Sequence, residues 1–373
     1  MKSNLIRWIA AAVLLCILPF LLSSQSQAEM VGVSEAAEET ETAAAATLPL
    51  DQKVPGCVPL ESGWTTVDPK DALTDEGVLS FGTAITSILK QDSKTGEWAP
   101  TGDAPVTSEY PWIRYEDPTI SVRTEYATVI PSSKYNKGKK LAASITYIKV
   151  ADASQVRTAM SDDKYDKRNY VSAETLAKHV NAVAAVNGDF FKYHYNTGYV
   201  LRQGEFYRDK LNGKRDLLLI DDQGNFHAVY AATSQAAADY IAALPEGRSI
   251  VNTFTLGPVL VVDGQARTIK TTVVADSGEF QWCYAQQRVG IVQVDDLEYA
   301  IVEVYGKTDG SQGMTVQEFA DLIAYLFPTC RMAYNLDGGG STNVVINGSR
   351  VHKTPGHRDI SDILYFASAW TEE

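Results

Sequence analysis

From about residue 111 onward, short runs of β-branched and aromatic residues alternate with turn signals, and this pattern limits what the chain can fold into. Such runs typically form strands, and the turn residues between them mark where the chain reverses. We expect strands at residues 120–123, 142–150, 216–220, 258–262, 289–294 and 300–304, with hairpin turns at 222–225 and 262–265. The sequence therefore predicts an α+β fold, a large mixed β-sheet core with a few helices packed on it.

Helical patterns are few and have clear boundaries. Residues 172–183, 234–244 and 315–327 carry apolar side chains at helical spacing. The last of these begins with the capping box Thr315-Val316-Gln317-Glu318, and Pro328 ends it. We expect each of the three helices to pack an apolar face on the sheet.

The N-terminal part of the chain has a different composition. Residues 1–28 have a basic start, an apolar run too short for a membrane span and a small-x-small cleavage pattern, which predicts a signal peptide. Residues 29–56 are a spacer rich in Ala, Glu and Thr, too poor in large apolar side chains to form a core. Residues 57–110 read as an N-terminal extension, and residues 111–370 as the main domain. We therefore expect a secreted or extracytoplasmic cell-envelope protein, with a membrane contact only through an uncleaved signal segment.

One stretch, Asn335-Leu336-Asp337-Gly338-Gly339-Gly340-Ser341-Thr342, has the composition of a ligand site. Consecutive glycines allow positive φ angles and bring bare backbone amides close to an anion. Asp337 follows an apolar segment, so its carboxylate is expected at a strand end. The alternative is a tight hairpin whose aspartate only caps the turn. The helix before this stretch and the strand after it favour a loop held for function.

A second stretch follows the same pattern. Asn187-Gly188-Asp189 follows a predicted helix and a short apolar run. Counted from Ala185 and from Ala333, the two stretches both read A-x-N-x-D. In a strand, residues two apart point to the same side, so each Asn and Asp should share a face. If the two strands are neighbours, two asparagines and two carboxylates line one pocket.

Two carboxyl groups are what glycosidic cleavage needs, one to protonate the leaving oxygen and one to act as base or nucleophile. Asp189 and Asp337 are the candidate catalytic pair. Phe190, Phe191, Tyr193 and Tyr195 would offer stacking surface to a sugar ring, and core packing is the alternative for the two phenylalanines.

At these two corners the chain resembles the phosphodiester glycosidase family. The matching pieces keep the family's order: Asn187 to Phe191, Gly198 to Gly204, Leu256 to Gly264, Arg288 to Gly290, Gly313 to Val316 and Asn335 to Thr342. The resemblance covers roughly Tyr110 to Ala369. This chain has Arg288-Val289 where the family often has Arg-Thr, and its N-terminal region lies outside the shared part.

The resemblance implies hydrolysis of a sugar-1-phosphodiester to free sugar and a phosphomonoester, with a phosphosugar-containing glycan or a small sugar phosphodiester as partner. It places the substrate-binding residues at Asn187, Gly188, Arg202, Arg288, Asn335, Gly338, Gly339, Gly340, Ser341, Thr342 and Arg358. Glycine amides together with Arg288 or Arg358 would bind the phosphate. For each arginine, pairing with a surface carboxylate is the alternative. A wall polymer or surface polysaccharide is the expected substrate source.

Charge and cysteine content exclude other classes. The net charge of −13, without a basic cluster, excludes nucleic acid as a partner. Three cysteines beyond the signal segment are too few for a disulfide scaffold; in an exported protein we expect Cys283 to pair with Cys330.

Three alternatives stay open at this point. The first is a non-catalytic glycan-binding or exopolysaccharide-assembly protein. The second is a serine hydrolase using Ser341, although the G-x-S-x-G pattern is incomplete. The third is dependence on Ca²⁺ or Mg²⁺, which oxygen ligands suit better than zinc. The residues themselves require no cofactor.

Overall fold

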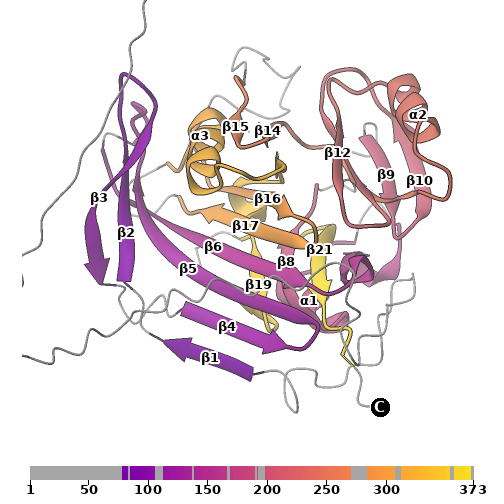
Figure 1. Cartoon of the computed structure of the whole chain (residues 1–373), viewed down its shortest axis with the longest axis horizontal. Coiled ribbons are helices and arrows are strands. Elements are labelled where there is room, and N and C mark those ends of the chain that lie inside the picture. The colour runs from indigo at the N-terminus through magenta and orange to yellow at the C-terminus, as the bar shows by residue number, and fades with distance from the viewer. Residues whose placement is uncertain are drawn as a thin grey trace, which may run out of the picture. The chain divides into compact units, whose positions relative to one another are not determined.

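Four β-sheets and three α-helices make up the part of the chain that a computed structural model describes (Figure 1). The described residues are 78–82, 85–105, 112–136, 138–165, 169–189, 191, 198–269, 284–306, 312–352 and 357–370. The predicted signal peptide and spacer, and Phe190, Tyr193, Tyr195, Cys57 and Cys283, lie outside them. Cys330 is a buried free thiol, so the expected disulfide between Cys283 and Cys330 is not formed in this structure.

The largest sheet has 11 strands, in the order β1-β4-β5-β6-β17-β16-β18-β14-β15, with β2 paired to β5 and β3 to β2. Its strands are β1 (Val78–Gly82), β2 (Ile85–Gln91), β3 (Trp98–Pro105), β4 (Trp112–Asp117), β5 (Ile120–Ile130), β6 (Leu141–Val150), β14 (Val259–Val262), β15 (Gln265–Ala266), β16 (Arg288–Asp295), β17 (Glu298–Val304) and β18 (Met332–Asn335). Only β2 and β5 run parallel within this sheet. Part of the expected N-terminal extension thus pairs directly with the main domain.

A five-stranded sheet, in the order β20-β19-β8-β21-β7, packs against the large one. Its strands are β7 (Val156–Met160), β8 (Ala182–Asn187), β19 (Val344–Ile346), β20 (Ser349–Arg350) and β21 (Asp362–Ala367). Side chains along β16 point alternately to the two faces of the large sheet. Val289 and Ile291 enter the core cluster between the two sheets, whereas Val292 joins the cluster on the opposite face.

Two smaller sheets complete the described part. One contains β11 (Leu217–Asp221), β12 (Phe226–Val229) and β13 (Ile250–Phe254), and the other contains β9 (Gly198–Arg202) and β10 (Glu205–Lys210). The expectation of one large mixed sheet was therefore wrong in part. The fold is broadly α+β, but it distributes its strands over several sheets and has little helix.

The three predicted helices are confirmed as α1 (Ala173–His179), α2 (Ser234–Ala242) and α3 (Val316–Leu326). The capping box of Thr315 and Glu318 starts α3, which packs Phe319, Leu322 and Ile323 on the outer face of the large sheet. Helix α1 covers the outer face of the five-stranded sheet. Within the described residues, no helix combines the length and the apolar character that crossing a membrane requires.

Candidate active site

The two A-x-N-x-D corners meet where β8 and β18 end. The amide of Asp337 donates to the Gly188 carbonyl at 3.2 Å. The Asn187 side chain bridges the corners, with Nδ2 donating to the Asp337 carbonyl at 2.7 Å and Oδ1 accepting from the Asn343 amide at 2.9 Å. The two strands belong to different sheets, so the condition that they are neighbours in one sheet is not met. Backbone and amide hydrogen bonds join the two corners instead.

The glycine bend carries the chain from one sheet to the other. Residues Gly339–Ser341 form a short 3₁₀ turn, in which Gly339 alone of the three glycines has a positive φ, 62°. The Gly339 amide donates to the Gln287 carbonyl at 3.0 Å, so it is not directed at an anion. A Cβ on Gly338 would lie 2.7 Å from the same carbonyl. Close backbone packing therefore leaves no room for a side chain at position 338, and the hydrogen bond to Gln287 fixes the backbone of Gly339. The bend is a crossover between two sheets rather than a hairpin.

Asp337 is a buried carboxyl group at this bend. Desolvation raises its pKa to about 7, and the carboxylates of Asp189 and Asp362 act in the same direction. A hydrogen bond from Ser341 and the charge of Arg358 oppose the rise. The Arg358 Nη2 donates to the Ser341 Oγ at 2.9 Å, which leaves the Ser341 hydroxyl hydrogen for Asp337. Asp337 is thus a buried carboxyl group whose pKa lies near neutral, and the exposed Arg358 acts on it electrostatically.

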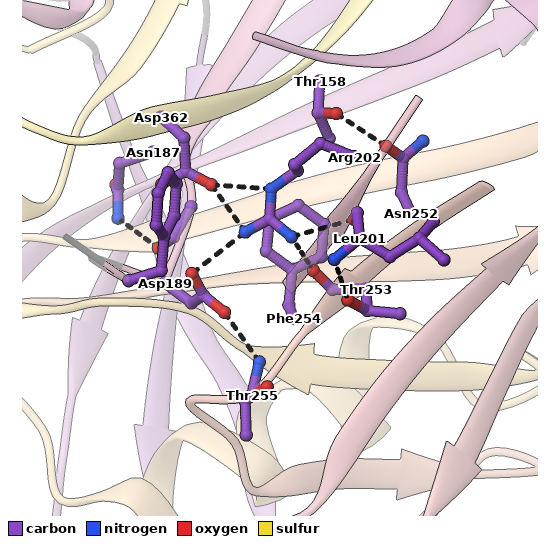
Figure 2. Close-up of polar contacts among 12 residues, drawn as sticks. Thr158, Asn187, Asp189, Leu201, Arg202, Asn252, Thr253, Phe254, Thr255 and Asp362 are labelled. Carbon is purple, nitrogen blue, oxygen red and sulfur yellow. Dashed lines mark hydrogen bonds and ion pairs between the residues drawn. The ribbon is translucent and has the colours of Figure 1, made fainter. Parts of the chain in front are cut away.

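Asp189 belongs to a buried ion cluster with Arg202 and Asp362 (Figure 2). Its Oδ1 accepts from Arg202 Nη2 at 3.0 Å and its Oδ2 from the Thr255 amide at 2.7 Å. Donors on both oxygens are the contacts of an ionised carboxylate. Asp189 and Asp337 therefore lie in one electrostatically coupled region, in different environments.

Arg202 is fully buried and uses every donor it has. Its Nη2 and Nε donate to Asp362 Oδ2 at 2.8 and 3.1 Å, and its Nη1 donates to the carbonyls of Leu201 and Thr253. With the bond to Asp189, all five guanidinium donors are satisfied within the protein. The prediction that Arg202 contacts substrate is corrected to a positioning role for Asp189.

The carboxylate of Asp362 leaves no room for a side chain at position 188. A Cβ on Gly188 would lie 2.4 Å from Asp362 Oδ2 and 2.5 Å from Oδ1, so only glycine lets this carboxylate approach. Both backbone polar groups of Gly188 are also used, the amide toward the Asp362 carbonyl and the carbonyl toward Asp337. Gly188 therefore serves the packing of the site.

The other predicted residues lie at different places around this corner. Arg288 is buried and donates to the carbonyls of Met314 and Tyr284, and its Nη1 would lie 3.9 Å from a Cβ on Gly338. Asn335 donates to the Gly257 carbonyl at 2.9 Å. Phe191 packs in a small core cluster, which agrees with core packing, the alternative to a stacking surface for a sugar. Arg358 is exposed and is anchored to the bend, since its amide donates to the Gly340 carbonyl at 2.7 Å.

Some acceptors at the glycine corner have no protein partner. Within the described part of the chain, Asn335 Oδ1, Thr342 Oγ1 and Asn343 Oδ1 are buried and make no hydrogen bond. Buried polar atoms are usually paired, so three unpaired ones at this corner are unusual. No group of three His, Cys, Asp or Glu side chains suited to a metal ion occurs among the described residues.

Sequence reasoning missed Asp362, Thr255 and Asn343. The available signal for Asp362 was a charged residue directly before the apolar run Ile363 to Phe366, in a strand that is otherwise buried. Thr255 contributes its backbone amide, which any residue type could supply. Asn343 offered a signal, since it follows the glycine bend as a third asparagine.

Comparisons with known proteins cover the residues of this site. A family model described as phosphodiester glycosidase matches residues 180–367, half of the chain, including both corners. The SPbeta prophage-derived uncharacterized protein YomE of Bacillus subtilis (strain 168) is 24% identical over 242 residues, 64% of this chain and 35% of that protein. The chain thus spans about a third of that relative's length.

A solved structure shares the fold. The catalytic domain of zebrafish N-acetylglucosamine-1-phosphodiester alpha-N-acetylglucosaminidase, auto-inhibited by its pro-peptide, matches with a TM-score of 0.53 at 17% identity, over 80% of this chain and 91% of that domain. The family match, the shared fold and the paired acidic corners lead to one conclusion: this chain belongs to the phosphodiester glycosidase family, a family of glycosidase-type hydrolases.

Proposed function

We propose that this protein hydrolyses the glycosidic bond of a sugar-1-phosphodiester, releasing free sugar and a phosphomonoester. The observation that carries the proposal is the combination of Asp337, a buried carboxyl group with a pKa of about 7, and the ion-paired Asp189, whose charge helps to raise that pKa. Two carboxyl groups whose environments separate their protonation states are the usual arrangement of a glycosidase.

Asp337 is the proposed general acid. A carboxyl group that stays protonated near neutral pH can give its proton to the leaving oxygen, and such catalysis typically contributes about 10²–10⁴-fold. Asp189 is the proposed base or nucleophile, because Arg202 and the Thr255 amide hold it as a carboxylate. The separation of the two groups in the substrate complex would decide between inversion and retention.

Arg358 is the proposed phosphate ligand. It is exposed, its backbone is tied to the bend, and its guanidinium lies against Ser341. A cation there could pair with the phosphate of the leaving group while Asp337 acts on the bridging oxygen. Arg288 suits this task less, since it donates to two backbone carbonyls.

The unpaired acceptors at the glycine corner are the proposed hydrogen-bond partners of the sugar. Asn335 Oδ1, Thr342 Oγ1 and Asn343 Oδ1 suit hydroxyl or acetamido donors of a sugar ring. The signal-like residues 1–28 support export and a cell-wall or surface glycan as substrate source. A glycan-binding or exopolysaccharide-assembly protein without turnover is the second candidate, supported by the same acceptors.

The test offers the purified protein UDP-N-acetylglucosamine and a methylphospho-sugar and measures free sugar. We expect release by the wild type, a loss of about 10²–10⁴-fold in Asp337→Asn, and a comparable loss in Asp189→Asn. Saccharide binding without turnover, unchanged in Asp337→Asn, would establish the binding-protein alternative instead. Loss in Ser341→Ala with full activity in both aspartate variants would indicate a serine hydrolase. An EDTA arm tests the alternative that activity depends on Ca²⁺ or Mg²⁺.

A further inference from the structure

The net charge of −13 conceals one short basic run, at residues 134–140 between β5 and β6. These positions carry four lysines and no acidic residue. Lys134, Lys139 and Lys140, the lysine loop, are exposed, and Lys134 and Lys140 form no ion pair within the described part of the chain. A run of like charges is most often a solvated loop, so the position of this run in the fold decides what it can bind.

A buried asparagine fixes the lysine loop in place. Asn136 is 0% exposed, its Oδ1 accepts from the Gln312 amide at 3.1 Å, and its Nδ2 donates to the Gly313 carbonyl. The Asn136 carbonyl also accepts from the Lys139 amide at 2.9 Å, which closes the turn between the lysines. The loop is therefore held against the segment that precedes α3.

That segment connects the lysine loop to the glycine bend. Met314 and Gln286 exchange backbone hydrogen bonds, from the Met314 amide at 2.9 Å and from the Gln286 amide at 3.1 Å. The next residue, Gln287, accepts from the Gly339 amide at 3.0 Å, and a Cβ on Gly339 would lie 3.3 Å from Gln286 Oε1. Two hydrogen-bonded segments therefore join the lysine loop to the bend that follows Asp337.

Two tyrosine rings accompany the lysines. Tyr135 follows Lys134 in the chain, Tyr284 precedes Gln286 by two residues, and the two ring centroids are 6.3 Å apart. Tyr284 is 47% exposed, and the Lys134 ammonium lies 5.4 Å from the Tyr135 ring centroid. An exposed ring offers an apolar face to a sugar, and an ammonium group attracts phosphate. The surface thus suits both parts of a sugar phosphate unit.

Arg358, the proposed phosphate ligand, contacts the same bend. Its amide donates to the Gly340 carbonyl at 2.7 Å, one residue along from the contact of Gly339 with Gln287. A substrate with a single phosphate would use Arg358 alone. A substrate whose phosphates recur along a chain would reach the lysine loop as well.

We propose that the lysine loop and Tyr284 bind a polyanionic glycan, so that the substrate is a chain of sugar phosphodiesters rather than one small diester. This inference rests on the proposed function and adds the class of substrate to it. The net charge of −13 repels a polyanion overall, so a local cationic surface would direct its approach to the glycine bend.

The test measures the binding of a poly(N-acetylglucosamine 1-phosphate) chain and of its one-repeat methyl diester by isothermal titration. The full-length Asp337→Asn variant is used, so that both ligands stay intact. We expect the chain to bind about tenfold more tightly than the diester, and Lys134→Gln combined with Lys140→Gln to remove this advantage without changing diester binding. The slope of log Kd against log salt should fall by about 1 for each lysine removed. Tyr284→Ala should also weaken binding of the chain.

Lys178→Gln combined with Lys210→Gln is the matched control. Lys178 on α1 and Lys210 on β10 are exposed, so this variant loses the same charge at other places on the surface. An equal loss of chain binding in the control would mean that net charge alone acts, and it would overturn the proposal. Thermal unfolding of each variant confirms that the fold is retained.

Other results would also overturn the proposal. One is equal affinity for the chain and for the diester. Tighter binding of an oligodeoxythymidylate would assign the lysine loop to nucleic acid, and tighter binding of phosphatidylglycerol vesicles would assign it to a membrane surface. If the wild type releases no free sugar from either ligand, the proposed hydrolysis fails, whereas the binding comparison still decides the role of the lysine loop.

Discussion

The carboxylate of Asp362 lies directly against the Cα of Gly188, so that a Cβ at this position would approach Asp362 Oδ2 to 2.4 Å. The contact joins the end of β8 to the start of β21 and places Asp362 on Arg202, which in turn holds Asp189. A residue without a side chain therefore sets the position of a catalytic candidate.

Gly188→Ala should destabilise the protein, because neither the backbone nor the ion-paired carboxylate can move aside freely. We expect a loss of about 1–3 kcal/mol in the free energy of unfolding, the usual range for overpacking. In urea titrations, Asp362→Ala should relieve the clash, so that the double variant loses clearly less than the sum of the two single variants. Strict additivity would show that the two residues do not press on each other.

Arg202→Met should be among the most destabilising substitutions in the protein. It leaves Asp189 and Asp362 buried without their cation, and breaking a buried ion pair in this way typically costs about 3–5 kcal/mol. Arg331→Met is the matched control, since Arg331 pairs with Asp295 and Asp296 at the surface, where such a pair contributes about 0–1 kcal/mol. Equal losses in the two variants would contradict the buried cluster.

Stability should depend on pH through Asp337. Its folded-state pKa of about 7 lies above the ordinary 3.8, so between these values the folded protein binds more protons than the unfolded chain. Stability therefore falls as pH rises across this window, by on the order of 4 kcal/mol for this group. Asp337→Asn removes the charge, so its stability relative to wild type should increase from pH 4 to pH 7. A difference that stays constant across this range would mean that Asp337 is not buried in its charged form.

The pH dependence of turnover should respond to Arg358. The positive charge of Arg358 lowers the pKa of Asp337, so Arg358→Gln should raise that pKa and move the alkaline fall in kcat/KM to higher pH. Loss of the proposed phosphate ligand should also reduce kcat/KM at the optimum by roughly 10²-fold. Arg331→Gln serves as the surface control. An unchanged alkaline limb in Arg358→Gln would separate Arg358 from Asp337.

Local signals in the sequence account for what could be predicted. The capping box at Thr315 and Glu318 located α3, and the turn residues 222–225 located the loop between β11 and β12. These features depend on residues within a few positions of one another. The repeated A-x-N-x-D pattern likewise indicated that the two corners belong together, because each corner ends a buried strand with an amide and a carboxylate.

Long-range geometry could not be predicted in the same way. The Arg202–Asp362 pair joins residues 160 positions apart, and no local pattern says which arginine meets which carboxylate. The assignment of β8 and β18 to different sheets also depends on pairings among distant strands. For this reason Arg202 was expected to contact a ligand, whereas its donors are consumed by Asp189, Asp362 and two carbonyls.

The most direct test of the proposed chemistry is turnover in ¹⁸O-labelled water with mass analysis of the phosphomonoester product. Hydrolysis of the glycosidic bond through Asp337 and Asp189 places the water oxygen on the sugar, so the phosphomonoester should contain no ¹⁸O. A phosphomonoester that carries one ¹⁸O atom would show cleavage of the phosphorus–oxygen bond and would contradict the account.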